Sequence, residues 1–136
     1  MLFRSGAEPS GNSVIVGLLL RLARMTDRED FRAVAERTLQ AFTLRLEEAG
    51  TGLPQMLVAL QFLLGTPREI VLAGPQDAEF LSSIRRHFLP GAVVMRAEQC
   101  SRPMPAVDGR PTAYVCENFA CKTPVTSAEE LRGLLE

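Results

Sequence analysis

Tryptophan is absent from this 136-residue chain, and aromatic residues make up only 6% of it. Neither sign of charge dominates, because 15 basic residues are mixed with 16 acidic ones. Proteins that bind nucleic acids usually present a basic surface and aromatic side chains on which bases stack. We therefore expect no nucleic-acid partner.

Long apolar runs are also missing. The most apolar stretch, Val14 to Leu20, is far shorter than the roughly 20 residues that a membrane-spanning helix needs. Three cysteines are an odd number and too few for a disulfide scaffold, which favours a reducing compartment. We expect a cytoplasmic chain with no membrane contact.

The stretch Glu69-Ile-Val-Leu-Ala-Gly74 divides the chain into two parts. Its four central residues are apolar and predict a short strand that is buried on both faces. The pattern is helical before this strand and alternates between strand and helix after it. We predict a mixed α/β protein with a helical segment at 6–66, a small α/β unit at 67–136 and a truncation or non-native seam at 1–5.

Three helices are expected in the helical segment. The first runs from a cap at Asn12 to about Met25, and the second begins with a capping box formed by Thr26 and Glu29 and continues past Leu46. The third covers 55–64, between Pro54 and Gly65. The first and third are apolar on all sides, which is typical of a helical hairpin taken from a larger layered or toroidal array.

The α/β unit should contain about three short strands. Asp77 opens a helix whose apolar stripe includes Phe88, and the next strand, 92–95, should pair in parallel with the first. A third strand is expected at 112–116. A capping box formed by Thr126 and Glu129 starts the last helix.

The cysteines are the most reactive candidates in the chain. Cys116 and Cys121 lie five positions apart, and with Cys100 and His87 they could form a zinc set, a redox pair or plain buried thiols. Asn118 tolerates a left-handed turn, so we expect the chain to fold back there and to bring the two sulfurs together. We predict Cys116 and Cys121 as a candidate redox pair, with both thiols reduced, and we expect no bound metal and no cofactor.

A second candidate site lies before the first helix. Glu8, Ser10 and Asn12 offer a carboxylate, a hydroxyl and an amide that could line a polar cleft with catalytic residues. Helix capping explains Ser10 and Asn12 equally well. Both interpretations stay open at this point.

Several motifs carry a family resemblance. They are Ala7-Glu-Pro-Ser-x-Asn-Ser13, Glu69-Ile-Val-x-x-Gly74, Thr112-Ala-Tyr-Val-Cys-Glu-Asn-x-x-Cys121 with Pro124, and Glu130-Leu-Arg-x-Leu-Leu135. In this order they resemble the C-terminal end of the spermatogenesis-associated protein 20 family of thioredoxin-domain-containing proteins. Ser5-Gly6 stands where that family usually has Asp-Gly, which agrees with a seam at Ser5.

The resemblance implies a larger architecture. Family members carry an N-terminal thioredoxin-like domain and a six-hairpin (α/α) toroid similar to glycosidases and sugar epimerases. The helical segment would then be the end of that toroid, and the missing domain and toroid would be its partners. Two functions follow as hypotheses: a carbohydrate-related enzyme whose isolated fragment is inactive, or a redox-linked or scaffolding protein whose α/β unit docks a partner domain.

Overall fold

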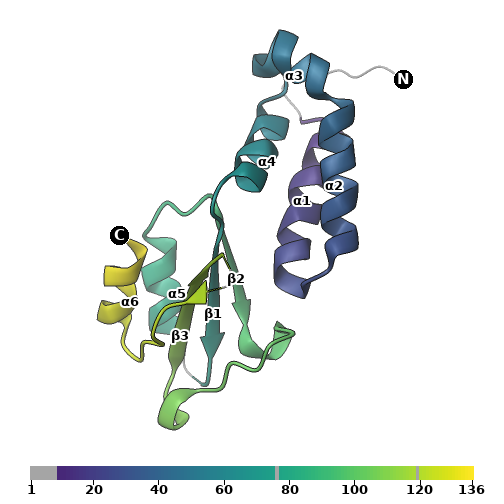
Figure 1. Ribbon diagram of the computed structural model, residues 1–136. Coiled ribbons are helices and arrows are strands. Elements are labelled where there is room, and N and C mark those ends of the chain that lie inside the picture. The colour runs from purple at the N-terminus through teal and green to yellow at the C-terminus, as the bar shows by residue number, and fades with distance from the viewer. Residues whose placement is uncertain (1–8, 76, 119) are drawn as a thin grey trace. The chain divides into compact units, whose positions relative to one another are not determined.

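The computed structural model describes residues 9–75, 77–118 and 120–136 (Figure 1). The chain forms two compact units, of which the first ends at Gly65 and the second spans Thr66–Glu136. The described residues form six α-helices and one four-stranded mixed sheet, which confirms the mixed α/β class. The predicted seam at 1–5 lies outside the described residues.

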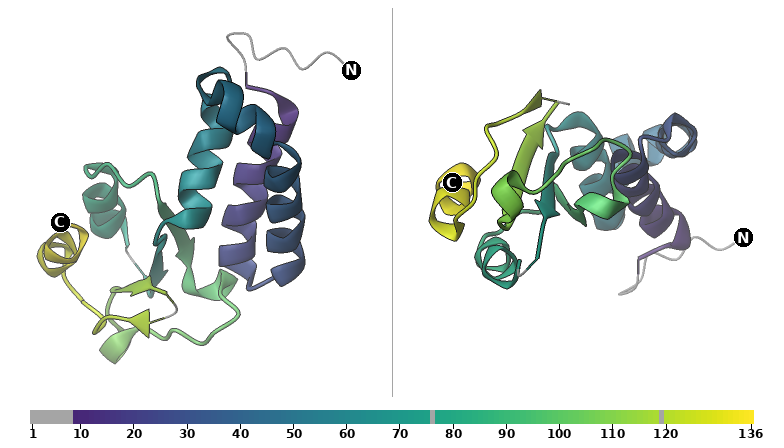
Figure 2. Two further views of the ribbon diagram at one scale, coloured as in Figure 1. Left: turned by 45° about the horizontal axis from the view of Figure 1, so that its top comes forward. Right: turned by 90° about the horizontal axis from the view of Figure 1, so that it is seen from below.

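The helical unit contains four α-helices. They are α1 (Gly11–Thr26), α2 (Glu29–Ala41), α3 (Thr43–Ala49) and α4 (Pro54–Leu64), with a 3₁₀ turn, η1 (Gly50–Gly52), before α4. The long α1 packs against both α2 and α4, as the views in Figure 2 show. The buried apolar side chains of this unit come from these three helices: Val16, Leu20, Ala35, Leu39, Met56, Ala59 and Phe62.

The beginnings of α1 and α2 differ from the predictions. Ser10 caps α1, because its hydroxyl accepts a hydrogen bond from the backbone N–H of Ser13, so Asn12 lies inside the first turn. The predicted capping box of Thr26 and Glu29 is wrong. Thr26 still belongs to α1 and donates its hydroxyl to the carbonyl of Leu22, while α2 begins after Arg28 without a side-chain cap.

The predicted second helix is two helices. It breaks at Phe42, whose φ of −100° and ψ of 3° end α2 and start α3. The predicted third helix is present as α4, with Pro54 at its first position and Gly65 following it. Proline has no backbone N–H, and it suits the first position of a helix because an N–H there would have no acceptor within the helix.

The α/β unit is built on a sheet in the order β2-β1-β3-β4. The strands are β1 (Arg68–Ala73), β2 (Ala92–Arg96), β3 (Thr112–Glu117) and β4 (Ala120–Cys121), and the helices are α5 (Ala78–Arg85) and α6 (Ala128–Leu135). β1 pairs with β2 in parallel, as predicted, and with β3 antiparallel.

One face of this sheet packs against α5 and α6 (Figure 2). The core on that face is Ile70, Leu72, Phe80, Ile84, Ala113, Val115, Leu131 and Leu135. Because side chains alternate along a strand, residues 69, 71 and 73 of β1 point to the opposite face, which we call the second face. That face is buried too, since Val71, Val93 and Met95 are 0%, 4% and 4% exposed.

Two details of the α/β unit correct the sequence analysis. Helix α5 ends at Arg85, and Phe88, expected in its apolar stripe, is 90% exposed. The predicted capping box of Thr126 and Glu129 is wrong, because Ser127 is the residue that caps the last helix. The hydroxyl of Ser127 accepts from the N–H of Glu130, and the Glu130 carboxylate accepts from the N–H of Thr126.

Candidate redox site at Cys116 and Cys121

A tight hairpin brings the two cysteines together. Cys116 on β3 and Cys121 on β4 are directly paired residues, and their Cα atoms are 3.8 Å apart. Asn118 adopts a left-handed conformation with φ of 49°, so the predicted fold-back is confirmed. The prediction of two reduced thiols is wrong, because the sulfurs form a disulfide.

The two sulfurs have different surroundings. Cys116 is fully buried on the second face of the sheet, whereas Cys121 is exposed on β4. β4 contains only two residues and lies at the edge of the sheet, and no strand among the described residues pairs with its outer side. The exposed cysteine of the disulfide therefore lies at the edge of the sheet.

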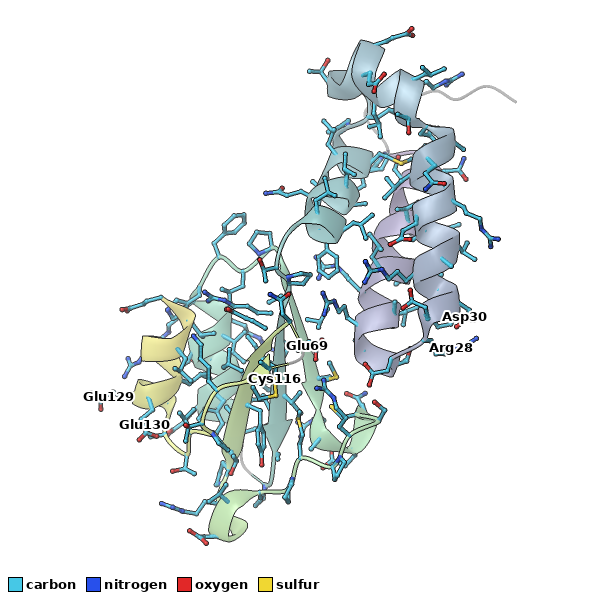
Figure 3. All side chains as sticks on the ribbon, in the orientation of Figure 1. Arg28, Asp30, Glu69, Cys116, Glu129 and Glu130 are labelled. Carbon is cyan, nitrogen blue, oxygen red and sulfur yellow. A yellow bond between two sulfur atoms is a disulfide. The ribbon has the colours of Figure 1, made fainter. Side chains whose placement is uncertain are left out.

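A buried carboxylate lies beside the disulfide. Glu69 on β1 is the cross-strand partner of Cys116, so both side chains are on the second face (Figure 3). Opposed residues on antiparallel strands have Cβ atoms about 4.5–5.5 Å apart. The side chain of Glu69 is only 2% exposed, and one of its carboxylate oxygens lies 2.7 Å from Nη2 of Arg102.

Arg102 comes from the long segment between β2 and β3. This segment is fixed to the second face by two further contacts: Tyr114 donates its hydroxyl to the carbonyl of Pro105 at 2.6 Å, and the N–H of Val107 donates to the hydroxyl of Thr112. A guanidinium next to a buried carboxylate offsets the cost of removing that charge from water. The pair therefore places a buried ion pair beside Cys116.

The zinc interpretation gains no support from the positions of Cys100 and His87. The thiol of Cys100 donates to the carbonyl of Arg96 at 3.7 Å, and Nδ1 of His87 lies 2.8 Å from the carbonyl of Ser83. Over 9–75, 77–118 and 120–136, no three His, Cys, Asp or Glu side chains are grouped as metal ligands. A cysteine engaged in a disulfide also has no thiolate to offer a metal.

Of the predicted cleft residues Glu8, Ser10 and Asn12, the structure describes Ser10 and Asn12, and Glu8 lies outside the described residues. Ser10 uses its hydroxyl to cap α1 and also lies 2.8 Å from the hydroxyl of the buried Ser13. Asn12 is half-buried in the first turn of α1. Helix capping therefore accounts for Ser10, and a catalytic role for the three residues stays a prediction.

The helical unit has a groove of its own. It has a volume of about 460 Å³ and opens between α2, α3 and α4. The lining residues are mainly leucines, with acidic and polar residues among them: Glu36, Leu39, Gln40, Thr43, Leu46, Glu47, Leu57, Leu60 and Leu63. An apolar wall of this kind fits an apolar partner better than a polar ligand.

Neither Glu69 nor Arg102 is predicted as a site residue from the sequence. Glu69 offered a signal, because a carboxylate at the start of a strand buried on both faces needs a partner. Arg102 offered none, since it lies in a segment whose prolines predict only a surface loop.

Comparisons with known proteins support the family resemblance. The chain is 34% identical to spermatogenesis-associated protein 20 of Homo sapiens over 147 aligned residues, and the match covers 97% of this chain. The chain is homologous to part of spermatogenesis-associated protein 20. The rat protein of that name is also 34% identical, and an uncharacterized protein of Caenorhabditis elegans is 30% identical over 96% of this chain.

The chain spans only 19% of the length of the human and rat proteins. That share agrees with the C-terminal portion that the motifs predicted. No family model matches the chain, and no solved structure does. Among the described residues, no helix combines the length and apolar character required to cross a membrane.

Proposed function

We propose that the α/β unit is a redox-linked element of a larger protein, in which the Cys116–Cys121 disulfide opens and closes reversibly. The observation that supports this proposal is the placement of the disulfide on an edge hairpin, where Cys116 is buried and Cys121 is an exposed residue. Structural disulfides in small proteins are usually enclosed, whereas exposed ones are more easily reduced.

Reduction would act locally. The hairpin also has backbone support, because the N–H of Lys122 donates to the carbonyl of Val115, and Ala113 and Val125 exchange two backbone hydrogen bonds. The segment after Cys121 would therefore stay near β3 when the disulfide opens, while Cys121 would no longer be tied to Cys116. A partner domain that docks at this edge would bind the two redox forms with different affinities.

A redox titration tests the proposal. The Cys100→Ser variant, which keeps only the candidate pair, is equilibrated in glutathione buffers, and free thiols are counted by alkylation and mass spectrometry. We expect a reversible two-electron transition in the folded protein, with a midpoint above about −300 mV. Unfolding is monitored in parallel by the fluorescence of Tyr114. Reduction that occurs only after the protein has unfolded would contradict the proposal.

The helical unit supports a second proposal, a structural one. Its leucine-lined groove and the exposed side chains of Val14, Ile15 and Leu18, at 48%, 53% and 53%, are apolar surfaces that the described residues leave uncovered. A helical array such as the six-hairpin toroid would cover them with neighbouring helices. On this proposal, the unit is the end of that toroid, and the remaining toroid and the thioredoxin-like domain are its partners.

A full-length relative provides the test. Leu57→Lys places a charge in the groove, while Leu44→Lys places the same charge at a side chain that is 71% exposed and does not line it. We expect Leu57→Lys to lower the thermal stability of the full-length protein more than Leu44→Lys does. Equal effects would argue against a covered groove.

The carbohydrate-related activity implied by the resemblance belongs to the longer protein. Glycoside hydrolysis requires two carboxyl groups about 5–10 Å apart that face a sugar. The groove does contain Glu36 and Glu47, but Glu36 is already paired with Nε of Arg32 at 2.8 Å. A full-length relative and its Glu47→Gln variant can be screened for activity on glycosides and free sugars. A loss of activity in the variant would show that the groove contributes to a carbohydrate site.

A further inference from the structure

We propose that thiol exchange at this disulfide begins at Sγ of Cys121, that a small thiol of the glutathione class is the attacking group, and that Cys116 is the resolving thiol. This inference rests on the proposed reversibility of the disulfide and adds which sulfur reacts. It assigns Cys121 as the site that carries the mixed disulfide.

The first argument is access. A thiolate attacks a disulfide along the line of the sulfur–sulfur bond, from the side opposite the sulfur that leaves. Cys116 has no exposed surface, so the approach to its sulfur is closed by the protein. Cys121 is an exposed residue on an edge strand of two residues, and from this we infer that a thiolate reaches its sulfur from solvent.

The second argument is electrostatic. Glutathione carries net negative charge, and the carboxylate of Glu69 lies on the same face as Cys116. A negatively charged thiol that approached Cys116 would meet Glu69 on the neighbouring strand, whereas Cys121 lies one strand farther from that carboxylate. Lys122, which follows Cys121 in the chain, is exposed and positive.

The exchange then proceeds in two balanced steps. In the first, the thiolate forms a bond to Sγ of Cys121, the sulfur–sulfur bond breaks, and Cys116 leaves with the electron pair as a thiolate that takes up a proton. In the second, another thiolate attacks the glutathione sulfur, which releases glutathione disulfide and the thiolate of Cys121. Two thiols are oxidised and the two cysteines are reduced.

The reverse direction uses the same geometry. When glutathione is attached to Cys121, the freed Cys116 stays directly opposite it across the β3–β4 pair. Its thiolate can attack Sγ of Cys121, reform the disulfide and expel glutathione. The hairpin would therefore limit the lifetime of the mixed disulfide, because the resolving thiol is held in place.

Matched single-cysteine variants test the assignment. In a Cys100→Ser background, Cys116→Ser leaves only Cys121 and Cys121→Ser leaves only Cys116. Each folded variant is incubated with oxidised glutathione, and addition of one glutathionyl group is followed by intact mass. We expect Cys121 to react at least about tenfold faster than Cys116, because reactivity requires an accessible thiolate. In urea the two rates should become similar.

A second measurement does not depend on the buried Cys116→Ser substitution. The Cys100→Ser protein with its disulfide intact is mixed with a limiting amount of reduced glutathione, quenched with acid and digested. The glutathionyl group should map to Cys121. Equal labelling of both cysteines, or a preference for Cys121 that persists in urea, would overturn the assignment. If the intact disulfide does not react at all in the folded protein, the proposed reversibility itself fails.

Discussion

Glu69 and Cys116 stand directly opposite each other on β1 and β3, so a buried carboxylate and a buried disulfide sulfur share one face of the sheet. Each belongs to a second pair: Glu69 contacts Arg102, and Cys116 is bonded to Cys121. The second face of the sheet therefore links the long segment before β3 to the hairpin after it. A change in the Glu69–Arg102 pair should therefore affect the Cys116–Cys121 pair, and a change in the disulfide should affect the ion pair.

Removing Arg102 should destabilise the α/β unit. Arg102→Met leaves the carboxylate of Glu69 buried without its guanidinium partner at 2.7 Å. We expect a loss of about 2–3 kcal/mol, somewhat below the cost for a fully buried pair because the Arg102 side chain is 36% exposed. The measurement is urea unfolding followed by Tyr114, the only tyrosine in the chain.

The double variant Glu69→Gln/Arg102→Met is the control for this prediction. It also removes the carboxylate charge that Arg102 offsets, so it should recover part of the stability that Arg102→Met loses. An unfolding midpoint of Arg102→Met equal to that of the unsubstituted protein would show that the ion pair contributes nothing.

The exposed pair Arg28–Asp30 should affect titration rather than buried structure. Both side chains face solvent at the start of α2, and hydrogen bonding from Arg28 lowers the pKa of Asp30 below its usual 3.8. A lowered pKa in the folded state stabilises the protein above the unfolded pKa, and this contribution is lost as the pH falls through the folded pKa. Arg28→Gln should return the pKa of Asp30 toward 3.8, as measured by NMR.

Arg37→Gln removes the same charge elsewhere on α2 and serves as the comparison for Arg28→Gln. The pKa of Asp30 should change much less in this variant, because the hydrogen bonds from Arg28 remain. A similar shift in both variants would mean that net charge, not the hydrogen-bonded pair, sets the pKa.

The cap of α1 should depend on Ser10 and not on Asn12. Ser10→Ala removes the hydroxyl that accepts from the N–H of Ser13, and we expect a cost of about 1 kcal/mol. Asn12→Ala should be close to neutral, because its position in the first turn requires no cap. Thermal unfolding followed by the helical circular dichroism signal compares the two variants, and a larger loss for Asn12→Ala would contradict the observed cap.

Gly74 should be the glycine least tolerant of substitution in the α/β unit. Its φ is +87°, and an added Cβ would lie 3.0 Å from the carbonyl oxygen of Arg110 and 3.1 Å from Cβ of Ala106. Gly74→Ala should therefore cost about 2–3 kcal/mol, from the left-handed backbone and the contact together.

Two other glycines separate these contributions. Gly109 also has a positive φ, 69°, but nothing lies within 4 Å of its added Cβ, so Gly109→Ala should cost about 1 kcal/mol. Gly91 has open space and no positive φ, and Gly91→Ala should have little effect. Urea unfolding that ranks the three variants differently would show that the contact at Gly74 is relieved.

The strands were predictable because their signal is local. The apolar run after Glu69 is bounded by Gly65 and Gly74, and β1 occupies that interval. The crossover through α5 required parallel pairing with β2, which the structure confirms. The antiparallel placement of β3 against β1 was not predicted, because contacts so distant in sequence leave no periodic pattern.

The helix starts were less predictable, because several residues satisfy the same capping pattern. In Thr126-Ser-Ala-Glu-Glu130, both Thr126 with Glu129 and Ser127 with Glu130 have the required spacing, and the structure uses Ser127 as the cap. At Thr26 the hydroxyl finds a carbonyl in the preceding turn, and Asp27 adopts a left-handed conformation instead of joining α2.

The candidate site was predictable only in part, because local turn chemistry can be recognised in a sequence and contacts between distant residues cannot. The fold-back at Asn118 follows from local turn chemistry, so the proximity of Cys116 and Cys121 was foreseen. The ion pair of Glu69 and Arg102 joins residues 33 positions apart, and only the folded sheet brings them together.

Opening the disulfide should have a small but measurable effect on stability. A disulfide stabilises a protein mainly by restricting the unfolded chain, and the effect grows with the length of the loop that it closes. Cys116 and Cys121 are separated by only five positions, so the chain-entropy model gives about 2 kcal/mol. The backbone hydrogen bonds from Lys122 and Val125 remain in the reduced form and keep the strand in place. We therefore expect reduced protein to stay folded, with a lower urea midpoint but a similar dependence of the unfolding free energy on urea concentration.

Cys121→Ser is the matched variant, because it removes the disulfide at the exposed position and leaves Cys116 buried. Unfolding curves of the oxidised protein with and without reductant, compared with that variant, give the difference in the free energy of unfolding.

A loss of unfolding free energy well above about 2 kcal/mol would mean that the disulfide alone holds the hairpin in place. Complete unfolding on reduction would exclude a reversible redox element in the folded protein.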